Sequence, residues 1–286
     1  MAEETLGEKV VGGALRFYDR HADRKTMATN RRVFLESVLD KRKDPITEAS
    51  FTPAELSELA KVIGAKYANL HDAADSYAAY LQKELAAHAA AVKDKNRDQM
   101  RYPEFVSQYK KDLNAIKAFK AGKFTQDFLD LASGAMTYER RIALQRASED
   151  NPRLQEAFNV KPYITYDDYN QTPAEAEAAH TVWATNPRAM LRTTLGQFGY
   201  AIDPKTGSLV VTDTYDFNPP KLIFTQKTVP ALPVGETDVA EGGWGAGGLY
   251  GLIRQYAGRV MPPGAGRPVR VQVNALAPPL QNNLVK

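Results

Sequence analysis

The sequence predicts an α+β protein, with a helical N-terminal bundle followed by a small mixed α/β module that has a β-hairpin and proline-rich extended arms. Two observations support this prediction. Residues 1–150 contain 25 Lys and Arg and 23 Asp and Glu, whereas the remaining 136 residues contain only 12 and 11. Helical periodicity also gives way after residue 150 to short alternating runs separated by Pro and Gly. We therefore expect a helical region at 1–150 and an α+β module at 151–286 that ends in an extended arm.

The first region is predicted to be a series of helices. The clearest helix start is at Thr52, where Glu55 completes a capping box and Pro53 occupies the first helical position. Apolar residues at three- to four-residue spacing, such as Tyr77 and Leu81, predict the buried faces of a bundle. Composition and spacing place the helices at residues 4–22, 27–42, 53–69, 72–95, 103–120, 125–131 and 135–147.

The second region is predicted to contain short strands and irregular segments. Alternation at 198–202 and 209–212 predicts two strands, joined by a turn at 203–207 that contains Asp203, Pro204 and Gly207. The other expected elements are a short strand or extended arm at 163–169, helices at 173–183 and 248–259, a proline-rich loop at 221–233, a last strand at 267–274 and an irregular arm at 275–286.

Composition excludes several classes of site. The chain has no Cys, which rules out disulfides, thiolate zinc sites and cysteine nucleophiles. No apolar run approaches the roughly 18 residues that a membrane span needs, so no membrane segment is predicted. The four His residues are far apart in the sequence, and we therefore expect no metal site.

A glycine-rich segment at 243–248, GWGAGG, has the spacing of a dinucleotide-binding motif. A dinucleotide site also needs a strand directly before the glycines, and residues 235–242 contain no apolar strand. We therefore predict no cofactor. The segment is interpreted as a turning loop in which Trp244 contacts a neighbour.

The end of the predicted strand at 209–212 carries a candidate acid/base pair. Asp213 and Asp216 flank Tyr215, and two carboxylates at this spacing are able to act as general acid and base or to bind a cation. Alternatively, they cap backbone N–H groups and fix the turn where the strand ends. The spacing is similar to the Asp-x-Tyr-Asp-x-x-x-His-Arg motif of colicin-M-like enzymes, which cleave the peptidoglycan precursor lipid II. Pro220 and Lys221 stand at the His and Arg positions.

Basic residues cluster in the first 43 positions, where acids are interleaved with them. Mixed charge of this kind is typical of a solvated helix face. The functional alternative is contact with DNA. The residues that would make this contact are Arg16, Arg20, Arg31, Arg32, Lys41, Arg42 and Lys43.

Several short segments together resemble a known module. They are ITYDDY at 164–169, TLGQF at 194–198, VTDTYDFN at 211–218, LYGLIR at 249–254 and RPVRV at 267–271, with DPITE at 44–48 and FTPAEL at 51–56 upstream. In this order they resemble a module of virion-associated proteins of tailed bacteriophages, notably the large internal or ejected proteins of short-tailed phages.

The resemblance implies a non-enzymatic structural or ejected virion component, made in the host cytoplasm. Its implied partners are other virion proteins and further copies of the chain, and proline-rich arms are suited to lying across a neighbouring subunit. A cell-envelope hydrolase using Asp213 and Asp216, a DNA-contacting accessory protein and a host-takeover interaction protein are the alternatives. The predicted interaction residues are Tyr166, Tyr169, Tyr215, Trp244 and Tyr250.

Overall fold

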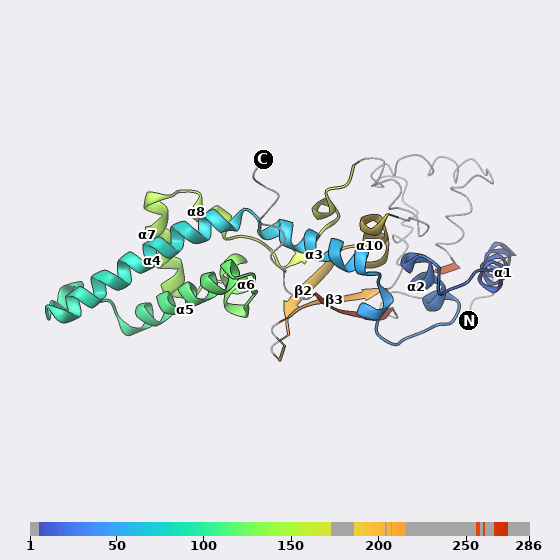
Figure 1. The fold of residues 1–286 in the computed structure, drawn as a ribbon, viewed down its shortest axis with the longest axis horizontal. Helices are drawn as coiled ribbons and strands as arrows, with labels where there is room; N and C mark the ends of the chain where they lie inside the picture. Colours follow the sequence, from blue (N-terminus) through green and yellow to red (C-terminus); the bar gives the residue numbers. More distant parts are fainter. Residues whose placement is uncertain are drawn as a thin grey trace. The chain divides into compact units, whose positions relative to one another are not determined.

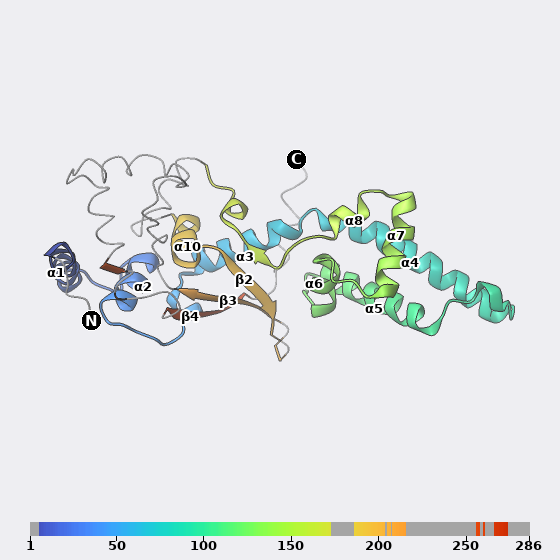
Figure 2. The same cartoon turned by 180° about the vertical axis from the view of Figure 1, so that it is seen from behind.

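A computed structural model confirms the α+β class: helices accompany a four-stranded antiparallel sheet. It describes residues 6–172, 186–203, 205–206, 208–215, 256–257, 260 and 266–273, and Figures 1 and 2 show them from two sides. By contact, the chain divides into two compact units. Unit 1 comprises Met1–Leu56, Thr165–Phe198 and Thr212–Val271, and unit 2 comprises Ser57–Ile164, Gly199–Val211 and Gln272–Lys286.

Each unit is assembled from non-contiguous segments. The drop in charge density near residue 150 predicts instead two consecutive regions, because charge density marks where solvated helices give way to strands. Contacts, by contrast, group elements that are distant in the sequence. The division into a helical region at 1–150 and an α+β module at 151–286 stays a prediction.

Unit 2 contains a bundle of helices. The long helix α4 (Leu70–Lys93) contacts α5 (Pro103–Lys120), α7 (Tyr138–Asp150) and α8 (Leu154–Ala157), and α5 also contacts α6 (Gln126–Ala132). Figures 1 and 2 both show α5 and α7 alongside α4, with α6 next to α5. A short 3₁₀ helix, η2 (Arg97–Gln99), precedes α5. The predicted helices are confirmed here with shifts of a few residues at their ends.

Local capping explains where two of these helices begin. The side chain of Thr125 accepts a hydrogen bond from the Phe128 amide at 3.1 Å, and that of Thr137 accepts one from the Arg140 amide at 3.2 Å. Both donors are among the first amides of a helix, which have no partner within the helix. The threonines therefore fix the first turns of α6 and α7.

Aromatic rings fill one part of the bundle core. Phe119 and Phe128 stack with centroids 4.0 Å apart and an interplanar angle of 10°, and the edge of Tyr67 meets Phe124 at 4.9 Å. The Tyr67 hydroxyl shares a hydrogen bond of 2.7 Å with the hydroxyl of Tyr200, and burial raises the pKa of Tyr67 to about 12. The buried Tyr67 hydroxyl therefore stays protonated at neutral pH.

A polar network fills another part of the bundle core. Arg140 donates to Asp112 at 2.7 Å, and their side chains are 3% and 0% exposed. Gln108 donates to the same carboxylate at 2.7 Å and Tyr77 at 3.2 Å. Thus α4, α5 and α7 each supply a member of one satisfied network. Removing a single partner from such a buried pair typically costs about 3–5 kcal/mol of stability.

Unit 1 begins with α1 (Leu6–His21) and α2 (Thr29–Val38), followed by the 3₁₀ helix η1 (Glu48–Ser50). The helix α3 (Pro53–Tyr67) starts as its capping box predicts: the Thr52 amide donates to Glu55 Oε2 at 2.7 Å, and the Glu55 amide donates to Thr52 at 3.3 Å. Thr29 at the start of α2 donates to the same Glu55 oxygen at 2.8 Å. One buried carboxylate therefore organises the first turns of two helices.

The sheet has the strand order β1 (Tyr163–Ile164), β2 (Phe198–Ile202), β3 (Leu209–Tyr215) and β4 (Arg267–Val273). The predicted hairpin is confirmed: the Asp203 amide donates to Ser208 O at 2.8 Å, and the Asp203 side chain accepts from the Lys205 amide at 2.7 Å. The strand predicted at 163–169 is only two residues long. From Tyr166 to Tyr169 the chain forms a 3₁₀ helix, η3, because Thr165 and Asp168 build a capping box.

The start of β4 is fixed by a buried arginine in unit 1. Arg267 is 1% exposed and donates to Asp44 O at 3.0 Å and to Glu36 Oε2 at 3.1 Å. Next to it, Ile46 and Val269 form a parallel bridge. Segments more than 220 residues apart in the sequence are thereby joined by backbone and side chain.

Candidate functional site

The candidate site lies in unit 1 and is built from η3 and α10 (Pro187–Leu195). It comprises Tyr166, Tyr169, Arg192 and Gly196, which we call the Tyr166 cluster. The two elements contact each other, and they carry two of the segments on which the phage resemblance depends, 164–169 and 194–198.

The capping box at Thr165 shapes η3. Asp168 Oδ2 accepts hydrogen bonds from the Thr165 amide at 2.7 Å and from its hydroxyl at 2.9 Å. Asn170 then ends the helix with φ of 45°, in the left-handed region that Asn tolerates better than most residues. These short polar side chains fix both ends of η3, which leaves Tyr166 and Tyr169 in defined directions.

Tyr169 anchors η3 in the core of unit 1. It is 1% exposed, and its hydroxyl donates to Gly196 O at 2.7 Å. Burial raises the pKa of Tyr169 well above its usual value, and the nearby Tyr166 and Asp213 raise it further. The hydroxyl is therefore a permanent hydrogen-bond donor at neutral pH and a structural tie between η3 and the end of α10.

Tyr166 stands at the surface in a fixed position. Its side chain is 46% exposed, and the Arg192 guanidinium carbon lies 4.9 Å from the centroid of its ring. Arg192 in turn donates to Gln171 Oε1 at 2.9 Å. A guanidinium over a tyrosine face is an attractive cation–π arrangement. The pair is therefore ordered on the surface.

Gly196 makes room for the Tyr166 hydroxyl. It has φ of 62° at the C-terminal end of α10, and a Cβ added there would lie 3.3 Å from that hydroxyl. A left-handed φ and a close approach both favour glycine. The glycine in TLGQF is thus explained by the geometry of the Tyr166 cluster.

The helix α10 was missed by the sequence analysis, although its signals are present. Asn186 caps it by accepting from the amides of Arg188 and Ala189 at 2.9 and 3.2 Å, and Pro187 occupies the first helical position. This start positions Arg188, which donates to Tyr169 O at 3.3 Å, and Arg192 one turn later. The cap, the proline and the closing Gly196 are the signals that predict such a helix.

Asp213 lies on β3. The burial pattern of the strand alternates, and half-buried Asp213 shares the phase of Val211 and Tyr215, which are 0% and 5% exposed. Its charge contributes to the raised pKa of Tyr169. Asp216 lies outside the described residues, so the structure does not test an acid/base pair between the two carboxylates.

The predicted interaction residues have different positions. Tyr166 is exposed, whereas Tyr169 and Tyr215 are buried. Trp244 and Tyr250 lie outside the described residues. In the described part of the chain, no group of three or more His, Asp or Glu residues is placed to hold a metal ion.

The basic residues predicted for DNA contact do not share one environment. Arg16 and Arg20 are exposed on α1, and Lys41 is also exposed. Others are engaged within unit 1: Arg42 pairs with Asp44 at 2.7 Å, and Arg32 donates to the Ser50 carbonyl at 2.6 Å. Arg31 and Lys43 also have interactions within the chain. DNA contact stays a prediction.

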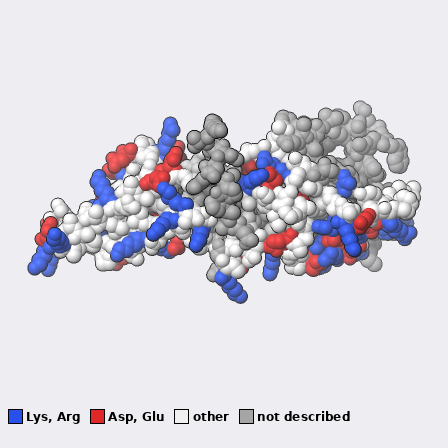
Figure 3. All heavy atoms as spheres, viewed as in Figure 1, with Lys and Arg blue, Asp and Glu red and all other residues white. Residues whose placement is uncertain are grey.

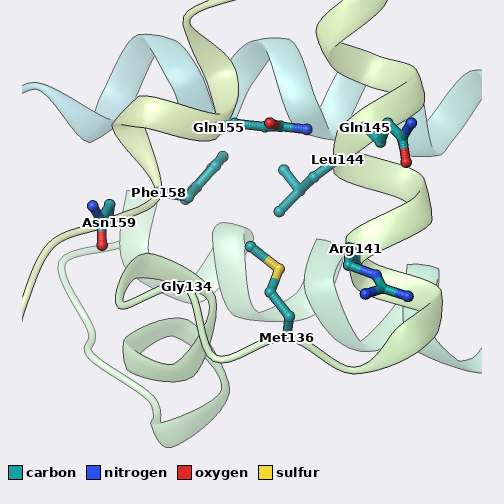
Figure 4. Close-up of a pocket in the computed structure, with 8 residues that line it drawn as sticks. All are labelled: Gly134, Met136, Arg141, Leu144, Gln145, Gln155, Phe158 and Asn159. Atoms are coloured by element: carbon teal, nitrogen blue, oxygen red, sulfur yellow. The ribbon is translucent and has the colours of Figure 1, made fainter.

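A surface hollow of about 640 Å³ lies in unit 2 between α7, α8 and the loop before α7. Figure 4 shows Leu144, Phe158 and Met136 converging on it, with Arg141 at its edge. Its remaining lining residues are Gly134, Gln145, Gln155 and Asn159. The hollow offers apolar contact and amide hydrogen bonds, which suit a protruding side chain of another molecule.

Among the described helices, none combines the length and hydropathy needed to cross a bilayer. Comparisons of the chain with protein-family models, with curated proteins and with solved structures found no match.

Proposed function

We propose that this chain is a non-enzymatic structural or ejected component of a bacteriophage virion, which works through protein–protein contacts in an oligomeric assembly. The observation that carries the contact role is the exposed Tyr166 ring, which lies against the half-buried guanidinium of Arg192. The phage context is supported by the resemblance of the motif segments.

The chemistry of the Tyr166 cluster suits a contact point between proteins. Tyr and Arg are enriched at the energetically dominant centres of protein interfaces. Ordering a flexible side chain on binding costs about 0.5–1.5 kcal/mol. Arg192, tied to Gln171, and Gly196, which admits the hydroxyl, hold Tyr166 in place before a partner arrives. The free chain therefore already holds Tyr166 in one position, which reduces the free-energy cost of ordering this side chain on binding.

The arrangement of the motif segments supports reading them as one module. Residues 44–48 and 267–271 meet through the bridge between Ile46 and Val269. Residues 164–169 and 194–198 meet through the hydrogen bond from Tyr169 to Gly196. Motifs that together define a module are expected to pack together, and these four segments are in contact as two pairs.

The first test is association with particles. Quantitative mass spectrometry of density-gradient-purified phage particles, from a lysate in which the chain is encoded, is expected to find it at a fixed copy number per particle. A chain that stays in the soluble fraction of the lysate contradicts the proposal. Cleavage of lipid II by the purified chain that disappears in Asp213→Asn contradicts it as well, in favour of the hydrolase.

The second test concerns the contact point. Tyr166→Ala is expected to raise the dissociation constant of the assembly about tenfold or more, as for truncation of an interface anchor. Tyr163→Ala is the matched control, because Tyr163 is 47% exposed and its ring also lies near a cation, Lys66 Nζ at 5.3 Å. Analytical ultracentrifugation of the full chain measures both. Equal effects of the two substitutions would remove the special role of Tyr166.

A further inference from the structure

The helix α1 has two apolar faces. Val11 and Leu15 are 1% and 5% exposed and pack inside unit 1. On the same side, a Cβ added to Gly12 would lie 3.0 Å from the ring of Tyr256. This face holds α1 onto its own unit, so the other apolar face is available for contact with another molecule.

The second face is an exposed stripe of Leu6, Val10, Gly13 and Phe17. The side chains of Leu6, Val10 and Phe17 are 80%, 55% and 67% exposed, and no atom of the described residues lies within 4 Å of a Cβ added to Gly13. At about 100° per residue, the four positions fall within about 60° around the helix axis. They therefore form a continuous line along one side of α1.

Basic residues border this stripe. Lys9, Arg16 and Arg20 are exposed, and the same helical geometry places all three along one edge of the stripe. The acidic Asp19 lies on the opposite side of α1, where it pairs with Arg24 at 2.6 Å. Figure 3 shows Lys and Arg side chains beside uncharged surface at α1. The exposed face therefore combines apolar side chains with net positive charge.

We propose that this face of α1 docks onto an anionic lipid surface, with the helix lying in the plane of the interface. A 16-residue helix is about 24 Å long, which is shorter than the roughly 30 Å hydrocarbon core, so it lies on the bilayer rather than across it. Leu6, Val10 and Phe17 would enter the acyl boundary while the basic edge meets the lipid phosphates. This inference is independent of the proposed function.

Charge and hydrophobicity favour lipid over the two other occupants. DNA would engage Arg16 and Arg20 but would leave the apolar stripe in water. A second copy of α1 packed antiparallel would cover the stripe but would place the two basic edges on the same side of the pair, which disfavours that pairing. An anionic bilayer is complementary to both parts of the face at once.

The test is flotation of the full chain with lipid vesicles. Binding is expected with phosphatidylcholine vesicles that contain about one third phosphatidylglycerol, and it is expected to weaken about fivefold for each basic residue neutralised in Lys9→Gln or Arg16→Gln. Phe17→Ser is expected to reduce partitioning about tenfold or more. Gly13→Leu fills the gap in the stripe and is expected to increase partitioning.

The control is Tyr102→Ser, which removes a 75% exposed aromatic ring from unit 2 and should leave vesicle binding unchanged. Circular dichroism verifies that each variant stays folded. The proposal is overturned if the wild-type chain floats no better than Phe17→Ser, or if Tyr102→Ser loses as much binding. It is also overturned if Phe17→Ser abolishes self-association or retention of duplex DNA while vesicle binding is absent.

Discussion

Two adjacent glycines in α1 meet opposite surroundings. A Cβ at Gly12 would lie 3.0–3.1 Å from the buried ring of Tyr256, whereas one at Gly13 would meet open space. Gly13→Ala is therefore expected to raise the free energy of unfolding by about 0.5–1 kcal/mol, because alanine restricts the unfolded chain and favours the helix. Gly12→Ala is expected not to raise the free energy of unfolding, because its Cβ would displace the ring of Tyr256. Chemical denaturation measures both, and equal stabilisation would show that α1 does not contact Tyr256 this way.

At the scale of single charges, Asp44 links stability to pH. The Arg42 guanidinium beside it, and then Arg267, hold the pKa of Asp44 below its usual value. A folded-state pKa below the unfolded one gives a contribution that is present at neutral pH and is lost as pH falls through the folded pKa. Unfolding temperatures are therefore expected to fall below about pH 4.

The matching variant is Asp44→Asn. This substitution should lower the unfolding temperature at neutral pH. It should also make the unfolding temperature fall less steeply as the pH is lowered, because the titrating carboxylate is gone. Calorimetry over a series of pH values provides the measurement. An unchanged acid profile in Asp44→Asn would assign the dependence to other carboxylates.

At the scale of elements, β4 depends on one buried arginine. Arg267 and Arg42 both pair with Glu36 and Asp44, yet their side chains are 1% and 44% exposed. Arg267→Met is expected to lower the free energy of unfolding by about 2 kcal/mol. This loss is smaller than for a buried ion pair that keeps only one partner, because Arg42 still neutralises the carboxylates. Arg42→Met is the control and is expected to cost less than about 1 kcal/mol, as for exposed pairs. Urea unfolding of the two variants compares them directly, and the reverse order of effects would contradict the account.

Local signals predicted some elements and long-range contacts decided others. The capping box of Thr52 and Glu55 lies within four residues, so the start of α3 was predictable from the sequence. The capping box at Thr165 is equally local, but the tyrosines of YITYDDY suggested a longer strand by β propensity. The helix α10 carries a cap and a proline, but only its last two residues, in TLGQF, entered the predictions.

The candidate site was predictable only in part. Tyr166 was identified from the sequence, but its partners Arg192 and Gly196 lie 26 and 30 positions away, and no periodicity links them. Tyr169 and Tyr215 share the composition of interface residues, and only the fold shows that they are buried. The separation of exposed from buried aromatic rings requires tertiary structure.

At the scale of the whole molecule, the two units differ in the sequence separation of the elements that contact one another. The helices α4 to α8 contact one another within a single stretch of chain. A fragment of residues 57–160 is therefore expected to fold as a cooperative helical bundle. A fragment of residues 151–286 lacks Glu36, Asp44 and Ile46, the partners of β4, and is expected not to fold alone. Circular dichroism and amide chemical-shift dispersion measure both, and a folded 151–286 fragment would favour two consecutive domains.

The joining of Asp44 and Ile46 to β4 has a consequence for synthesis. The ribosome releases the N-terminal helices long before Arg267 and Val269 are translated. Unit 1 therefore lacks β4 at a stage when all helices of the bundle in unit 2 have already been synthesised. A prematurely terminated polypeptide keeps Ile46 and its neighbours uncovered and is a substrate for cellular proteases. Only chains translated past β4 acquire a closed unit 1.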